Sequence, residues 1–108
     1  MTTAIAMKEG TLDSGIDKHF GRCAFFFIVN EETGESEIIE NPANQVAGCK
    51  ADVIVKILSE KNVSKVISGD FGSTVQQLLN EKQIQMIIYP DDKMNVQQIV
   101  AFLVKKHN

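Results

Sequence analysis

The chain has 108 residues, 44% of them hydrophobic, and a formal net charge of -3 at pH 7. This length suits one domain with its own core, and the acidic balance argues against a nucleic-acid partner, which requires clustered lysines and arginines. No apolar run approaches the roughly 20 residues that span a bilayer, and residues 1–8 lack the features of a signal peptide. We therefore expect one cytoplasmic domain over residues 1–108, binding neither nucleic acid nor a membrane.

The first half of the chain predicts three strands and one long loop. Residues 3–7 suit a central strand, and residues 24–29 form an aromatic-rich run typical of a strand buried on both faces. A turn at 30–34, where Gly34 supplies a positive φ, leads to a polar strand at 36–40 that fits a sheet edge. The loop at residues 8–22 is long for a compact domain, and long loops are usually functional or disordered.

The second half predicts alternating helices and strands. Apolar residues at helical spacing indicate a helix from about residue 48 to 61, with Asn62 as its cap. A strand at 63–68 follows, and Ser73 with Gln76 resembles a capping box that opens a second helix. The last strand covers residues 84–89, and Asn95 caps a final amphipathic helix.

This order, β-β-β-α-β-α-β-α, predicts an α/β fold with helices on both faces of the sheet, because the alternation implies right-handed crossovers between parallel strands. If the fourth strand pairs with the first, the result is a five-stranded mixed sheet of order 3-2-1-4-5. The chain then departs in opposite directions on either side of the first strand, which opens a crevice at the carboxyl ends of the strands. Four connections meet there: residues 8–22, 41–49, 69–74 and 90–95.

These connections would bring His19, Cys23, Cys49, Gly69 and Gly72 to one crevice, although a tight strand-to-helix turn is the competing reading for the two glycines. Cys49 precedes a helix, whose dipole and free N–H groups stabilise a thiolate. Thiolate and imidazole favour iron–sulfur, zinc or copper over magnesium or calcium. Cys23 opens the aromatic strand, so a small core residue is the competing reading for it.

The local charge and the absence of catalytic motifs favour binding over catalysis. Lys18, Arg22 and Lys50 would add positive charge at the crevice, which suits an anionic ligand. The first strand carries no carboxylates for two metal ions, and the chain has no P-loop, G-x-S-x-G or C-x-x-C motif. We therefore do not expect an enzyme.

Residues 13–22 read DSGIDKHFGR and precede the aromatic strand, a combination that resembles the signature of the dinitrogenase iron–molybdenum cofactor biosynthesis family. The similarity continues in order through residues 40–43, 47–48 and 66–72, and so spans nearly the whole chain. The resemblance implies a ribonuclease H-like three-layer α/β/α fold. It also implies binding or carriage of an iron–sulfur or iron–molybdenum cluster, or its precursor, between donor and acceptor proteins. Cys23 departs from the family pattern, in which a small uncharged residue is expected.

Within this resemblance, the histidine matching His19 is the favoured ligand. The predicted cofactor-binding residues are His19, Phe20, Gly21, Arg22, Lys18, Gly48, Lys50 and Gly69, and the predicted metal ligands are His19, Cys49 and Cys23. Two alternatives remain open. One is a protein–protein adaptor with structural thiols, and the other is a mononuclear zinc or copper site on His19, Cys23 and Cys49.

Overall fold

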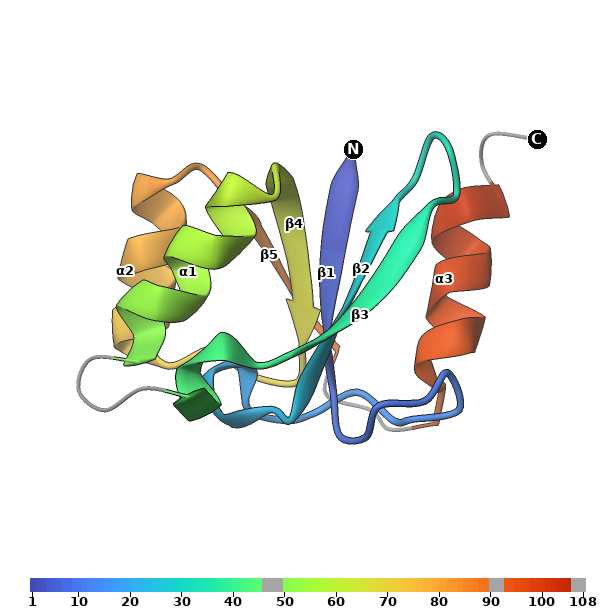
Figure 1. Cartoon of the computed structure of the whole chain (residues 1–108), viewed down its shortest axis with the longest axis horizontal. Helices are drawn as coiled ribbons and strands as arrows, with labels where there is room; N and C mark the ends of the chain where they lie inside the picture. Colours follow the sequence, from blue (N-terminus) through green and yellow to red (C-terminus); the bar gives the residue numbers. More distant parts are fainter. Residues whose placement is uncertain (46–49, 90–92, 106–108) are drawn as a thin grey trace.

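The structure, a computed structural model, describes residues 1–45, 50–89 and 93–105. Its five strands form one sheet in the order β3-β2-β1-β4-β5, and α1 and α2 lie together on one side of it with α3 on the other (Figure 1). The sheet order and the three layers are those predicted from the sequence. The strands are β1 (Thr2–Met7), β2 (Phe25–Asn30), β3 (Ser36–Glu40), β4 (Val63–Ser68) and β5 (Gln85–Ile88), and the helices are α1 (Lys50–Glu60), α2 (Ser73–Glu81), α3 (Val96–Lys105) and the short 3-10 turns η1 (Phe20–Arg22) and η2 (Pro42–Gln45).

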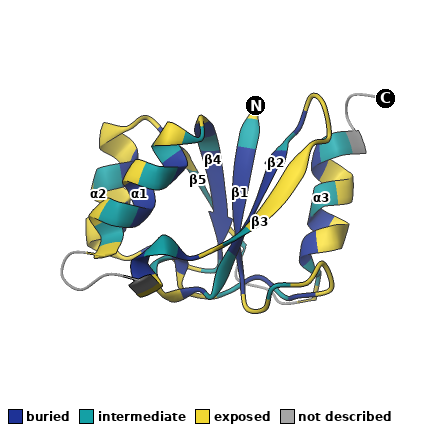
Figure 2. Cartoon of the chain, viewed as in Figure 1, coloured by how far each residue is buried: buried dark blue, intermediate teal, exposed yellow. Residues whose placement is uncertain are grey.

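The core lies on both faces of the three central strands, which are the most buried part of the sheet in Figure 2. Side chains alternate between the faces, so Phe26 packs in the cluster under α1 and α2, whereas Phe27 packs in the cluster under α3. The prediction of a strand buried on both faces is therefore confirmed. The outer strand β3 is mostly exposed and carries Glu37 and Glu40, as expected of a sheet edge.

The mixed sheet places the carboxyl ends of β1 and β4 side by side. Strand β1 runs antiparallel to β2 and parallel to β4. Loops that are distant in the sequence meet at this end of the sheet, which is the lower end in Figure 1. The loop after β1 is hydrogen-bonded to the segment after β4 through Phe20 and Asp70, and to the start of α3 through Ser14 and Val96. We call this the site end.

The helices are short, and local sequence determines how they begin. The predicted capping box at Ser73 is wrong: Gly72 is the N-cap of α2, it has no side-chain cap, and the Gln76 amide donates to the Phe71 carbonyl instead. A reciprocal box is found at α3, where Asn95 and Gln98 each bond the other's backbone N–H at 2.9 Å. Within the described residues, no helix is long and apolar enough to cross a membrane.

Candidate functional site

The loop between β1 and β2 is attached to two strand ends at once by the backbone of Asp17. The Asp17 N–H donates to the Ala6 carbonyl of β1 at 2.9 Å, and the Asp17 carbonyl accepts from Gly69 N–H at 2.9 Å and from the Ser68 hydroxyl at 3.2 Å. These bonds use groups that would otherwise be left unpaired where the strands end. The middle of a long loop is thereby fixed over the junction of β1 and β4.

Gly69 makes this close approach possible. A Cβ added at Gly69 would lie 2.7 Å from the Lys18 Cα, a distance that real Cβ atoms essentially never show. The sequence predicts Gly69 as a cofactor-binding residue. In the structure, glycine is needed at this position for packing, because the loop backbone crosses directly over Gly69.

His19 is exposed, and its main chain is held by its neighbours. Its N–H donates to Asp17 Oδ1 at 2.9 Å, and its carbonyl accepts from Arg22 N–H at 3.3 Å as η1 begins. The next residue, Phe20, is buried, with its ring centroid 5.2 Å from that of Phe26 and 5.4 Å from that of Phe71. The buried Phe20 ring and the hydrogen bond to the Asp17 carboxylate therefore fix the backbone on either side of His19, while its imidazole faces solvent.

Beside His19 lies a hollow of about 200 Å³ between η1 and the start of α2. Arg22 and Asp70 contribute charged groups to it, and Val75 contributes an apolar wall. The Asp70 carboxylate accepts from Phe71 N–H at 2.8 Å, so part of its hydrogen-bonding capacity is already used. We call this the His19 hollow; it is lined by His19, Phe20, Gly21, Arg22, Asp70, Gly72 and Val75.

The structure brings four of the predicted site residues together in the His19 hollow, namely His19, Phe20, Gly21 and Arg22. Lys18 is exposed next to them, and Lys50 is exposed at the first position of α1. Gly48 and Cys49 lie outside the described residues, so the meeting of His19 with Cys49 stays a prediction. Gly72, which the topology predicts at the same crevice, also lines the hollow, whereas Asp70 and Val75 join it without having been predicted there.

Cys23 is fully buried in the core cluster under α1 and α2. Burial, reinforced by the nearby negative charge of Asp17, raises the pKa of its thiol to about 12. The neighbouring Asn41 amide donates to the Cys23 carbonyl at 2.9 Å and approaches its sulfur at 3.8 Å. A thiol in this environment stays protonated and behaves as a small core residue, so its ionisation as a metal ligand is disfavoured.

Over residues 1–45, 50–89 and 93–105, no three His, Cys, Asp or Glu side chains are grouped so that they could hold a metal ion. Of the residues that line the His19 hollow, His19 has the side chain suited to bind a soft or borderline metal ion. A mononuclear site using His19, Cys23 and Cys49 would need Cys49, which is not described. The described part of the site therefore offers one exposed imidazole, the cationic Arg22 and the anionic Asp70.

The fold defines a class of three-layer α/β proteins with a five-stranded mixed sheet, and comparison with known proteins narrows this class. The family described as "Dinitrogenase iron-molybdenum cofactor" matches residues 1–106. The chain belongs to this family. No match is found among the curated proteins.

Solved structures share the fold. The apo form of the orange protein from Desulfovibrio gigas superposes with a TM-score of 0.82 at 20% identity, covering 98% of this chain and 88% of the other. A Thermotoga protein provisionally assigned as NifB gives 0.73 at 26% identity, covering 94% and 85%. A provisionally assigned dinitrogenase from Methanocaldococcus jannaschii gives 0.69 at 18% identity, covering 99% and 90%. At 20% and 18% identity, the orange protein and the Methanocaldococcus jannaschii protein support the fold assignment alone.

Proposed function

We propose that this chain binds a metal–sulfur cluster, either an iron–sulfur cluster or the iron–molybdenum cofactor or its precursor, and carries it from a donor to an acceptor protein in the cytoplasm. The observation that carries the proposal is an exposed imidazole, His19, held on an ordered loop beside the His19 hollow. Membership of a family named for the iron–molybdenum cofactor supports the choice of ligand.

The chemistry of the described residues fits such a cargo. The His19 imidazole is a suitable ligand for iron, and the Arg22 guanidinium offers charge-assisted hydrogen bonds to an anionic cluster. Lys18, exposed next to His19, adds a second positive charge. Cys49 is the proposed second ligand, by virtue of its position in the sequence before α1.

A small number of protein ligands favours carriage over permanent storage. A cluster held by one imidazole and one thiolate has only two bonds to the protein, so an acceptor protein can compete for it. The described residues show no built metal cage that would retain the cargo. We propose a carrier rather than a storage protein for this reason.

The test is an anaerobic titration of metal-free protein with isolated iron–molybdenum cofactor, and in parallel with a synthetic iron–sulfur cluster, followed by absorption and metal analysis. We expect about one cluster per chain, and uptake weakened at least tenfold in His19→Ala. The chain has two histidines, so His107→Ala is the matched control and should bind as the wild type does. Unchanged uptake by His19→Ala would overturn the site.

Metal analysis of the purified protein, the same titration and a partner-binding assay separate the alternatives. A zinc or copper site would give that metal alone, without sulfide, in protein as purified. An adaptor would take up neither cluster, and its partner would remain bound to metal-free protein carrying both His19→Ala and Cys49→Ser.

A further inference from the structure

Two glycines line the His19 hollow from opposite sides: Gly21 within η1 and Gly72 at the start of α2. Their backbones do not require glycine. Gly72 has φ −65° and ψ 158°, which any residue adopts, and among the described glycines positive φ is found at Gly34 and not at these two. Conformation therefore does not explain either glycine.

Packing does not explain them either. A Cβ added at Gly21 or at Gly72 would meet no heavy atom within 4 Å. Gly69, a few residues before Gly72, is the contrasting case, because its Cβ would strike the Lys18 backbone. Both glycines are among the residues that line the His19 hollow, and open space surrounds the position of each missing Cβ.

Gly72 also forgoes a stabilising interaction. It is the N-cap of α2 and leaves this helix without a side-chain cap, where serine, aspartate or asparagine would satisfy a backbone N–H. Glycine at this position thus does less for the fold than a common alternative residue would. The loss is small, because glycine is itself tolerated at an N-cap, and it leaves open space beside residue 72.

We propose that Gly21 and Gly72 keep the His19 hollow open for the cargo, so that a compact anionic metal–sulfur cluster sits between η1 and α2, against the His19 imidazole. This inference rests on the proposed function and adds to it which residues set the size of the site. Arg22, Asp70 and Val75 line the same hollow, and the Asp70 carboxylate already accepts a hydrogen bond from the Phe71 N–H. A cluster in this position makes van der Waals contact with both glycine α-carbons.

The test compares alanine substitutions inside and outside the hollow. Gly21→Ala, Gly72→Ala and the double variant add methyl groups at residues that line the hollow, whereas Gly15→Ala is the control, because Gly15 does not line it and its Cβ would make an ordinary 3.7 Å contact with Lys8. We expect the double variant to take up isolated iron–molybdenum cofactor at least tenfold more weakly, with no loss in melting temperature, and Gly15→Ala to match the wild type.

Gly72→Ser sharpens the test, because a serine N-cap stabilises the helix while it places a larger side chain at a residue that lines the hollow. Its melting temperature should rise and its cofactor uptake should fall, a combination that a merely structural glycine would not produce. Wild-type uptake by a stably folded Gly21→Ala/Gly72→Ala variant would overturn this inference and leave the proposed function standing. A wild-type chain that binds no cofactor would overturn both.

Discussion

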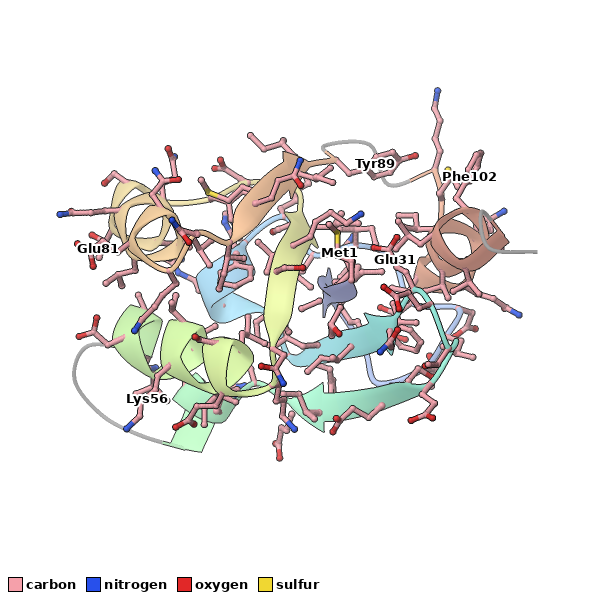
Figure 3. All side chains as sticks on the ribbon, turned by 90° about the horizontal axis from the view of Figure 1, so that it is seen from above. Met1, Glu31, Lys56, Glu81, Tyr89 and Phe102 are labelled. Atoms are coloured by element: carbon pink, nitrogen blue, oxygen red, sulfur yellow. The ribbon has the colours of Figure 1, made fainter. Side chains whose placement is uncertain are left out.

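The two ends of the sheet differ in whether their charged side chains are buried and paired or exposed. At the end opposite the site, Lys65 of β4 and Glu31 after β2 form an ion pair with a 2.9 Å Nζ–Oε2 distance, and Thr3 donates to the same carboxylate oxygen at 2.5 Å. The Lys65 and Glu31 side chains are only 9% and 6% exposed. Figure 3 shows Glu31 beside Met1, whose carbonyl accepts from the Glu31 N–H. At the site end, His19 and Arg22 are exposed, and the hydrogen bonds that order the loop come mainly from its backbone.

This difference separates stability from binding. Glu31 and Lys65, which we together call the closed end, neutralise each other's charge, so neither charge is available to a ligand. The site end orders its backbone through Asp17, Ser68 and Gly69 and leaves the His19 imidazole available. Variants of the closed end should therefore alter stability without altering cluster uptake, and variants that fill the His19 hollow should do the reverse.

The largest stability effect is expected at the closed end. Lys65→Met leaves Glu31 as a buried carboxylate with Thr3 as its remaining side-chain partner, and breaking a buried pair in this way typically costs about 3–5 kcal/mol. Urea unfolding measures this loss. Cofactor uptake at a temperature where the variant remains folded should be unchanged.

The control for this prediction is Lys61→Met, which breaks the pair between Lys61 and Glu37. These side chains are 35% and 52% exposed, so the loss should stay within about 1 kcal/mol. Equal losses in Lys61→Met and Lys65→Met would contradict the assignment of the closed end as a buried structural pair.

A smaller loss is expected from Gly69→Ala, which forces the loop away from β4 at the site end. Overpacking of this kind typically costs about 1–3 kcal/mol, and here it also displaces the backbone that precedes His19. Thermal unfolding and cofactor uptake should both be impaired. Wild-type values for Gly69→Ala in both measurements would show that the close approach to Lys18 is not needed.

The acid stability of the protein should depend on Glu31. Burial alone would raise its pKa, but hydrogen bonds from Thr3 and Lys65 and the charge of Lys65 lower that pKa below the usual 4.5. The unfolded chain then binds a proton at this group before the folded chain does, so its contribution is complete above about pH 4.5 and is lost as the pH falls through the lower, folded pKa. The slope of unfolding free energy against pH in this acid range should be shallower in Glu31→Gln, and an identical slope would argue against the shift.

The smallest stability effect is expected at Asp17, whose carboxylate caps the His19 N–H. Asp17→Ala removes this bond and should cost about 1 kcal/mol, whereas Asp17→Asn keeps an acceptor oxygen in place. Nitrogen-15 relaxation of the His19 amide should show faster motion in Asp17→Ala and recovery in Asp17→Asn. Cofactor uptake should follow the same order, and equal mobility in both variants would remove the proposed role of the cap.

The sequence predicts the sheet well because strand and helix periods differ, and because chain order restricts the topology. It misplaces one cap: Ser73 and Asn95 carry similar local signals, but the Gln76 amide bonds the carbonyl of Phe71, the residue before the N-cap of α2. A side chain near a helix start has several local backbone groups within reach, and the sequence pattern does not say which of them it bonds.

The site is harder to predict, because it depends on which loops touch. Residues 19–22 are identified by their unusual composition and Gly72 by the sheet topology, whereas Asp70 and Val75 join them because η1 lies near the start of α2. Sequence alone also cannot separate the glycines at 21 and 69. One leaves space open and the other is filled by neighbouring backbone, a distinction that exists only in three dimensions.

The most direct test of the account is whether a His19 nitrogen binds the cluster. Protein labelled with nitrogen-15 in histidine and carrying His107→Gln has His19 as its single histidine. After loading with isolated iron–molybdenum cofactor, pulsed electron paramagnetic resonance should detect a nitrogen-15 coupling from the imidazole. A fully loaded protein without that coupling would contradict the central claim.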